Sequence, residues 1–377
     1  MTSWERMART MKGELPDRVP VMCQLSIGHM LLQTGYSPHE FWLSAEVFAA
    51  GLLELRKLYS FDGILISLHG HKADWQKDIS SVQREGEKEV VIWRNGDRTI
   101  FPPDDLPLHQ PARPSTPPEL ASFDPDLIPE EIDYIPVSQG LMFYFDPEDS
   151  YRIFDLVKSQ AGRDFSIHGE VTSPFDYYLH LFGLEQAMVS LIKAPDKVKA
   201  ILQRFTHGII KIAQRQLKKG VDAIKISSPF AGAAFISPKF YREFVLPFER
   251  QIALAIREKG VPAYLHTCGA IRDRLELMVA TGVSGLECLD PPPLGDVTLA
   301  EAKRRIGQQV FIKGNIDPVN VLLKGDRETV KQDVLTRLSI GKVGGRYILS
   351  TACSVAPHTP RSNVQLLAEL VEEAGWY

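Results

Sequence analysis

The residues with the clearest chemical potential lie in the segment Tyr264-Leu265-His266-Thr267-Cys268-Gly269. A short apolar run, Val261 to Leu265, precedes a histidine and a cysteine two positions apart, and Gly269 then ends the pattern. Side chains alternate along an extended strand, so His266 and Cys268 are expected to point in the same direction. An imidazole and a thiolate that converge at a strand end are two ligands of a zinc-type site. Because such pairs also arise by chance, the prediction depends on further ligands elsewhere in the chain.

Two further candidate ligands follow later strand-like runs. Cys353 comes shortly after Tyr347–Ser350 and lies 85 residues beyond Cys268. Asp290 ends the run Gly285–Leu289 and lies 22 residues beyond Cys268. A spacing this long is unlike the short local spacings of a structural zinc knuckle, so the fold would have to bring these ligands together.

Each candidate also has an ordinary structural explanation. A lone cysteine is often a small buried hydrophobe, an aspartate before prolines often caps a turn, and a histidine can be a hydrogen-bonded core residue. Glu287 is a second choice for the oxygen ligand, because it lies earlier on its run and is expected to face the other way. Cys23 and Cys288 are interpreted as packing residues. Because these four candidates all lie at the ends of three predicted strands, we favour a metal site made of His266, Cys268, Cys353 and Asp290.

Two thiolates and one imidazole favour thiol chemistry over the activation of water. Strong sulfur donors reduce the electrophilicity of zinc toward water, whereas a bound substrate thiol would still be held as a thiolate at neutral pH. A thiolate of this kind can attack a methyl group. A weakly held carboxylate could leave when the substrate arrives and so keep one position open.

These residues require a fold that gathers strand ends on one face. Short β-branched runs alternate with amphipathic runs, such as Pro238–Lys259, Ile271–Ala280, Leu299–Ile306 and Arg327–Ile340. This alternation is typical of a parallel sheet covered by helices, and eight units predict a (β/α)8 TIM barrel with reactive groups at the C-terminal strand ends. A doubly wound open sheet is the alternative. The eight predicted strands are Val19–Cys23, Gly63–Ser67, Phe165–Gly169, Ala223–Ser227, Ala263–His266, Gly285–Leu289, Val310–Lys313 and Tyr347–Ser350.

One region after the second predicted strand departs from this alternation. Lys88–Trp93 and Arg98–Phe101 flank an Asn-Gly turn and predict a β-hairpin. A proline-rich tract follows from Pro102 to Pro136 and cannot form a regular helix. We therefore predict one barrel domain over residues 1–377 with an insertion at 74–136, which either shapes the mouth of the site or only packs on the surface.

The composition narrows the class of protein. The chain has 377 residues, 44% of them hydrophobic, and a net charge of −4 without a basic block, which argues against a nucleic-acid partner. Four cysteines in so long a chain favour a reducing compartment over a disulfide framework. We find neither a signal-peptide core nor an apolar run of membrane-spanning length. These features predict a soluble cytoplasmic protein.

Several motifs resemble the uroporphyrinogen decarboxylase superfamily over nearly the whole chain. They are Glu14-Leu-Pro-Asp-Arg-Val-Pro-Val21, Gly220-Val-Asp-Ala-Ile-Lys-Ile226, Ile236–Pro247 and Lys313-Gly-Asn-Ile-Asp-Pro318. The resemblance implies a (β/α)8 barrel, in agreement with the strand count, and is compatible with a homodimer.

Within this superfamily, the metal ligands look like those of the zinc-dependent methylcobamide methyltransferases. That branch carries His-x-Cys and a much later Cys, which here are His266, Cys268 and Cys353. The related cobalamin-independent methionine synthases add a carboxylate after His-x-Cys, and Asp290 matches that position with Asp in place of Glu. The resemblance implies a zinc cofactor and a corrinoid carried on a separate partner protein.

The decarboxylase reaction fits this sequence less well. True decarboxylases carry an Arg-rich segment after the first strand, whereas Met22–His29 contains no Arg. Their pyrrole-binding aspartate falls on Gly63, with Asp62 one residue away, and their C-terminal histidine corresponds to Cys353.

Other polar residues at predicted strand ends are candidates for the pocket. We expect His358 as the acid/base residue, with Tyr177 and Asn315 as further catalytic candidates. Ordinary turn and cap roles are the alternative for each of them. Further candidate contacts are Asp317, Tyr178, Ser227-Ser228-Pro229, His69 and His71.

The sequence therefore predicts a zinc-dependent methyltransferase that moves a methyl group between a partner's corrinoid and a thiol or other small acceptor. The alternatives are a metal-free lyase of the decarboxylase type acting on a tetrapyrrole, and a non-catalytic scaffold that binds at the barrel mouth.

Overall fold

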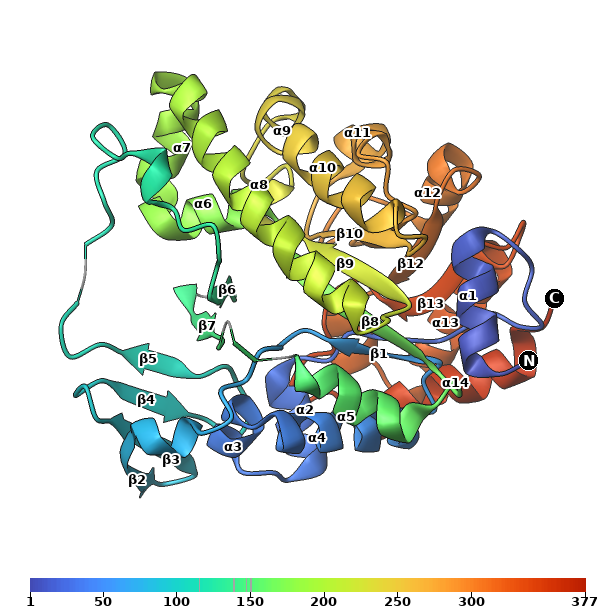
Figure 1. The fold of residues 1–377 in the computed structure, drawn as a ribbon. Helices are drawn as coiled ribbons and strands as arrows, with labels where there is room; N and C mark the ends of the chain where they lie inside the picture. The colour runs from blue at the N-terminus through green and yellow to red at the C-terminus, as the bar shows by residue number, and fades with distance from the viewer. Residues whose placement is uncertain (115, 138–139, 147, 150) are drawn as a thin grey trace.

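The computed structural model describes residues 1–114, 116–137, 140–146, 148–149 and 151–377. Its centre is a parallel sheet of seven strands in the order β1-β8-β9-β10-β11-β12-β13, curled into a barrel with helices outside (Figure 1). This arrangement confirms the predicted α/β barrel and excludes the doubly wound order. The barrel strands are β1 (Gly63–Ile66), β8 (Ser166–Thr172), β9 (Ala223–Ser227), β10 (Ala263–Thr267), β11 (Gly285–Cys288), β12 (Phe311–Ile316) and β13 (Tyr347–Thr351).

The first predicted strand, Val19–Cys23, is not a strand of the sheet. It forms only isolated bridges, among them Val21 to Leu349 of β13, and the Val21 carbonyl accepts a hydrogen bond from the Asp62 amide at 2.8 Å. Pro20 lacks an amide hydrogen and so interrupts a regular ladder at this position. The segment still lies between β13 and β1 and closes the barrel.

The helices cover the outside of the barrel and follow the predicted alternation, with two differences. The predicted helix Pro238–Lys259 is two helices, because Val245 leaves helical geometry just before Leu246-Pro247. The predicted helix Ile271–Ala280 begins as a 3₁₀ turn and becomes α-helical only at Leu275. The helices are α1 (Ser3–Lys12), α2 (Ile27–Thr34), α3 (Pro38–Leu43), α4 (Ala45–Tyr59), α5 (Arg152–Ala161), α6 (Pro174–Phe182), α7 (Leu184–Lys193), α8 (Pro195–Lys218), α9 (Pro238–Phe244), α10 (Leu246–Arg257), α11 (Leu275–Ala280), α12 (Leu299–Ile306), α13 (Arg327–Gly341) and α14 (Arg361–Ala374).

Helix α1 closes the N-terminal end of the barrel. Its Met7 and Met11 are buried in an apolar cluster with Tyr264 of β10 and Phe311 of β12. The two chain termini lie close together at this end of the molecule (Figure 1). Because this end is filled by packed side chains, the opposite end is the one that can open to a ligand.

The insertion after β1 lies beyond the C-terminal strand ends. The predicted hairpin is confirmed and belongs to a four-stranded antiparallel sheet, in the order β2-β3-β4-β5. A second pair, β6 and β7, lies between this sheet and the barrel (Figure 1). The strands are β2 (Ile79–Glu85), β3 (Lys88–Trp93), β4 (Arg98–Phe101), β5 (Leu108–Gln110), β6 (Tyr134–Pro136) and β7 (Met142–Tyr144).

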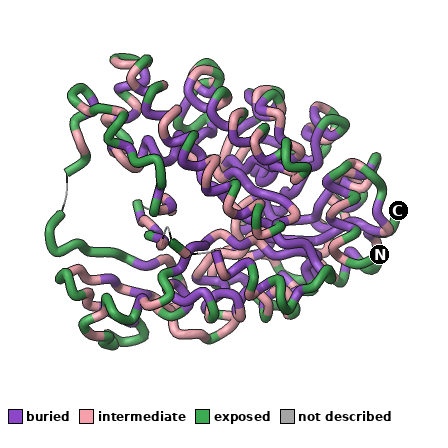
Figure 2. The backbone as a smooth tube through the Cα atoms, in the orientation of Figure 1, coloured by how far each residue is buried: buried purple, intermediate pink, exposed green. Residues whose placement is uncertain are grey.

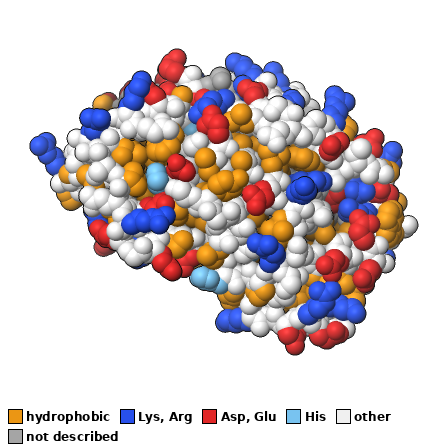
Figure 3. All heavy atoms as spheres, turned by 90° about the horizontal axis from the view of Figure 1, so that it is seen from below, with side chains coloured by type: hydrophobic (Ala, Val, Ile, Leu, Met, Phe, Trp, Pro, Cys, Tyr) orange, Lys and Arg blue, Asp and Glu red, His pale blue; other side chains and the backbone are white. Residues whose placement is uncertain are grey.

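Burial and charge follow this division. The barrel strands are buried almost throughout, whereas much of the connection between β5 and β6 is exposed (Figure 2). On the face shown in Figure 3, acidic and basic side chains are interspersed around apolar ones, and no block of a single charge is visible. Among the described helices, none has the length and apolarity needed to cross a bilayer.

Candidate metal centre

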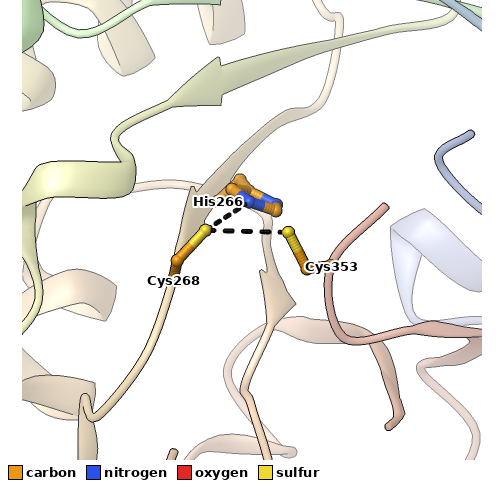
Figure 4. Close-up of side chains that lie close together, drawn as sticks. All are labelled: His266, Cys268 and Cys353. Carbon is orange, nitrogen blue, oxygen red and sulfur yellow. Dashed lines mark hydrogen bonds between the residues drawn. The ribbon is translucent and has the colours of Figure 1, made fainter. Parts of the chain in front are cut away.

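The strand ends bring His266, Cys268 and Cys353 together as the sequence predicts. His266 lies on β10, Cys268 follows that strand directly, and Cys353 follows β13 (Figure 4). The His266 Nε2 atom lies 3.3 Å from Cys268 Sγ, which is 3.8 Å from Cys353 Sγ. The potential ligand atoms of the three residues all lie within 4.8 Å of one another. Residues 85 positions apart in the chain therefore form one candidate metal site.

The geometry of these atoms fits zinc. Two thiolates bound to tetrahedral zinc at about 2.3 Å are separated by about 3.8 Å, which is the Cys268 to Cys353 sulfur separation observed. The sulfurs need not move apart or together to accept the ion. Three protein ligands also leave one position of a tetrahedron for a substrate.

The strand register fixes the orientation of the histidine ring. His266 of β10 pairs with Glu287 of β11, and His266 Nδ1 lies 3.0 Å from Glu287 Oε2. With Nδ1 donating to this carboxylate, Nε2 is left to face the sulfurs. A carboxylate that orients a histidine in this way is a common support for a zinc ligand. The second-choice oxygen ligand, Glu287, thus contacts the histidine from inside the barrel.

Glu287 is itself held ionised by two buried lysines. Lys313 forms a short ion pair with it, and Lys225 Nζ lies 3.9 Å from Glu287 Oε2. Although burial alone would raise the pKa of Glu287, these two cations hold it well below its usual range. Burial lowers the pKa of His266, but the Cys268 thiolate and Glu287 overcome this and raise it to about 9. The negative charges of Cys268 and Glu287 beside the histidine are therefore balanced in part by the two lysines.

Cys268 has the character of a thiolate. The neighbouring Cys288 and Cys353 thiols, together with His266, hold its pKa far below that of a free thiol. The bond to Cys268 and burial raise the pKa of Cys353 well above its usual value. Sequence reasoning treated Cys288 as a packing residue; it is fully buried, and its thiol also contacts the cluster.

Asp290 lies beside the three residues but is engaged elsewhere. Its Oδ2 accepts hydrogen bonds from the Gly269 amide at 2.7 Å and from Cys288 Sγ at 3.3 Å. It does not belong to the group of ligand atoms within 4.8 Å of one another. A ligand role for Asp290 would require it to exchange these bonds for the metal, and it remains a prediction.

The metal-centre ligands line a cavity of about 760 Å³ at the barrel mouth. Its walls also include β6 residues Ile135 and Pro136, and Asp105 and Leu106 of the connection that follows β4. The insertion therefore shapes the mouth of the site. A cavity of this size is in the range that holds a small organic ligand.

Two acidic residues of this cavity were not expected from the sequence. Asp176 lies in the first turn of α6, and Glu170 lies on β8. Burial, with the neighbouring charge of Glu249, raises the pKa of Asp176 well above its usual value. Glu170 directly follows the predicted strand Phe165–Gly169, and this position at a C-terminal strand end could have identified it. Asp176 lies further along the chain, in α6, and had no such signal.

The three predicted catalytic residues lie outside this cavity wall. His358 is two-thirds exposed and its Nε2 lies 3.1 Å from Asp104 Oδ2. The buried Tyr177 donates its hydroxyl hydrogen to the Tyr134 carbonyl at 2.8 Å. The buried Asn315 donates to the Leu289 and Val297 carbonyls. Tyr177 and Asn315 thus have structural hydrogen bonds that account for them, and a catalytic role for any of the three remains a prediction.

The further predicted contacts divide between the cavity and the structure around it. Ser227 and Pro229 line the cavity. Asp317 caps the helical turn that follows it, and Tyr178 donates to the Ala187 carbonyl. His69 and His71 are buried, and burial lowers the pKa of His69 to about 4 and that of His71 to about 3.

Comparison with known proteins identifies the class. Residues 146–374, which include all three metal-centre ligands, match the family model described as uroporphyrinogen decarboxylase (URO-D). The chain belongs to this family. Over its whole length the fold is similar to a solved methyltransferase from Methanosarcina mazei, with a TM-score of 0.74 at 20% identity and 99% of each chain covered.

The relatives of known activity include methyltransferases and decarboxylases. The chain is 29% identical over 214 residues to the methylcobamide:CoM methyltransferase MtbA of Methanosarcina acetivorans, covering 57% of this chain and 60% of that protein. It is 28% identical over 225 residues to the uroporphyrinogen decarboxylase of Prochlorococcus marinus, covering 58% and 62%. The matched region thus spans about 60% of the length of these relatives.

Proposed function

We propose that this protein is a zinc-dependent methyltransferase that exchanges a methyl group between a corrinoid carried on a partner protein and a small thiol. One observation carries the proposal: His266, Cys268 and Cys353 meet with the sulfur separation that tetrahedral zinc requires. The similarity to the MtbA methyltransferase supports the same reaction class. The reducing cytoplasm predicted from the cysteine count would suit a centre built on free thiols.

The residues of the chain divide the work of the reaction. Cys268, Cys353 and His266 Nε2 would hold the ion, and Glu287 would orient the imidazole through Nδ1. When bound, zinc would lower the pKa of a substrate thiol so that it reacts as a thiolate at neutral pH. Such a sulfur would form the new bond to the methyl carbon as the partner's corrinoid released the methyl group and kept the bonding electron pair. The walls formed by β6 and the Asp105–Leu106 segment would limit the access of water to the sulfur.

A decarboxylase reaction on a tetrapyrrole is less consistent with the cavity. Porphyrinogen carboxylates need cationic partners, and among the described residues that line the cavity none is a Lys or Arg. Asp62, the residue nearest to the expected pyrrole ligand, is fully buried and bonded to Arg6 and Arg18, away from this cavity. The same cavity holds three potential zinc ligands within 4.8 Å of one another, which decarboxylation without a metal would not use.

The test is the metal content and activity of anaerobically purified protein. We expect about one zinc per chain, and loss of most of it in Cys268→Ser and Cys353→Ser, because each variant removes one of three ligands. Cys23→Ala is the matched control, since Cys23 is buried outside the cluster and should keep its zinc. Methyl transfer from free methylcobalamin to added thiols, followed by its absorbance, should fall with the zinc. Metal-free protein, or full zinc retention in Cys353→Ser, would refute the proposal, and turnover of uroporphyrinogen would establish the decarboxylase instead.

A further inference from the structure

The cavity around the metal centre is acidic. Among the described residues that line it, the ionisable groups other than the metal-centre ligands are Asp105, Glu170, Asp176 and His180. Lys and Arg are absent from this lining. A small anion entering the cavity would therefore meet carboxylates without a compensating cation.

Two of these carboxylates have an unused acceptor. Asp176 Oδ2 and Glu170 Oε2 are buried oxygen atoms without a hydrogen-bond partner in the described structure. Asp176 is only 5% exposed, so water has little access to it from outside the cavity. An unpaired buried carboxylate oxygen is costly, and such groups commonly await a ligand.

The cation next to the cavity residue Glu170 is already paired with carboxylates of the chain. Lys225 is fully buried, and its ammonium group donates to Gln24 Oε1 at 2.7 Å and contacts Glu170 Oε1 at 3.0 Å. Glu287 Oε2 lies 3.9 Å away on its remaining side. Two of the three ammonium hydrogens of Lys225 therefore have acceptors within hydrogen-bond distance, and the positive charge is shared between two carboxylates. It neutralises Glu170 only in part, because the second oxygen of that carboxylate stays unpaired.

Asp176 lines the same cavity as His266, Cys268 and Cys353. A single small molecule could therefore place a sulfur at the metal centre and a cation at Asp176.

We propose that the acceptor is a small aminothiol that carries an ammonium group and no anionic group, with the ammonium bound between Asp176 and Glu170. This inference rests on the proposed function, because it names the substrate class of the same centre. Among the described residues that line the cavity, a thiol with an anionic group would find no Lys or Arg. Asp176 and Glu170 are thus specificity-determining residues.

The test compares three ligands that differ only in the charge of one end. They are 2-(methylthio)ethylamine, 2-(methylthio)ethanol and 2-(methylthio)ethanesulfonate, the methylated forms of a cationic, a neutral and an anionic thiol. Their binding to the metal-free protein is measured by calorimetry, because the charged end is expected to contact the carboxylates of the protein and not zinc. We expect the amine to bind about tenfold more tightly than the alcohol, and the sulfonate to bind more weakly than both.

Variants locate the effect. Asp176→Asn should weaken the amine about tenfold and leave the alcohol unchanged, since a bound ammonium favours the ionised form of the Asp176 carboxyl and an amide of the same shape cannot ionise. Glu170→Gln is a second variant with the same expectation, used also if Asp176→Asn does not fold. Glu185→Gln is the matched control, because Glu185 is an exposed carboxylate of α7 outside the cavity lining.

Three results would overturn the inference: equal affinities for the three ligands, tightest binding of the sulfonate, or no measurable binding of the amine. A loss of amine and alcohol affinity to the same extent in Asp176→Asn would do so as well. These failures are separate from failure of the proposed function. Zinc that depends on Cys353 together with a preference for the sulfonate would refute only the aminothiol, whereas a metal-free protein with the amine preference intact would refute only the zinc chemistry.

Discussion

The two ends of the barrel both bury charged groups, but they treat them differently. At the closed N-terminal end, Asp62 accepts hydrogen bonds from Arg6 at 2.7 Å, Arg18 at 2.9 Å and the Val21 amide at 2.8 Å. At the open end, Asp176 and Glu170 each keep a buried oxygen without a partner. Buried carboxylates therefore have hydrogen bonds to both oxygens at the closed end, whereas at the open end one oxygen of each has no partner.

The difference shows which charges stabilise the fold and which are available to a ligand. A buried carboxylate whose acceptors are all used can only hold its neighbours in place. A carboxylate with an unused acceptor can still gain a hydrogen bond, and a ligand can donate it. Between the two ends lies the Glu287 network, which is fully paired with Lys313 yet directs His266 toward the sulfurs. Variants at each level can test this division.

The largest effect on folding is expected at the closed end. Asp62→Asn removes the buried anion that Arg6 and Arg18 share and leaves Arg6 only Asp17 and Arg18 only Glu372 as ion-pair partners, so we expect the free energy of unfolding to fall by about 3 kcal/mol. Zinc affinity should stay unchanged, because Asp62 does not contact the metal-centre network. Urea unfolding and a zinc titration of the same sample measure both quantities. A marked loss of zinc affinity would show that the two ends are coupled and would remove the distinction.

The next effect concerns Glu249, a fully buried carboxyl in the open half. Among the described residues it forms hydrogen bonds with Ser173 and Tyr241 and no ion pair, and burial raises its pKa to about 7. The folded pKa lies above the unfolded value of about 4.5, so the folded state binds the proton more tightly. Its contribution to stability is therefore complete below pH 4.5 and is lost as the pH rises through 7.

Glu249→Gln should remove this loss. We expect the variant to match the wild type at pH 4.5 and to exceed it by about 3 kcal/mol at pH 8. Urea unfolding across this range gives the difference between the two proteins, in which the other titrating groups cancel. Parallel curves for the two proteins would mean that the pKa of Glu249 is not raised by folding.

A smaller effect is expected in the network between the two ends. Glu287→Gln keeps a hydrogen-bond acceptor for His266 Nδ1 but removes its charge, so we expect zinc affinity to fall by about 10–100-fold. Competition with a chromophoric chelator measures this change. Glu170→Gln is the matched control, since it also removes a carboxylate beside Lys225 but does not contact His266. If both variants lose zinc equally, the loss reflects the net charge and not the orientation of the ring.

The sequence was sufficient for the part of the site that depends on periodicity. His266 and Cys268 share a face because side chains alternate along β10, and Cys353 joins them because parallel strands end at one edge of a barrel. The barrel followed from the same alternation of strands and helices. The first strand was wrong because Pro20 interrupts its ladder while the apolar pattern of Val19–Cys23 remains.

The remainder depends on register and packing, which periodicity does not determine. Glu287 was expected to face away from Asp290, but Cys288 and Leu289 between them both take positive φ values, so alternation along the strand ends there. The opposition of Glu287 to His266 is set by the pairing of β10 with β11. Asp176 has an ordinary role as an acidic residue in the first turn of a helix, and only the tertiary structure shows that it also lines the cavity.

The smallest effect is expected at His358, which the sequence favours as the acid/base residue. The imidazole is two-thirds exposed and pairs with an exposed carboxylate, Asp104, so it belongs to neither of the buried networks. We expect His358→Ala to change the free energy of unfolding by less than about 0.5 kcal/mol and the rate of methyl transfer by less than about twofold. Asp104→Asn should behave alike, because each variant breaks the same surface pair. A loss of about 100-fold or more in His358→Ala alone would identify His358 as a general acid or base. In that event the mouth of the barrel would close over the substrate during turnover. His358 would then enter the cavity and contact the bound substrate.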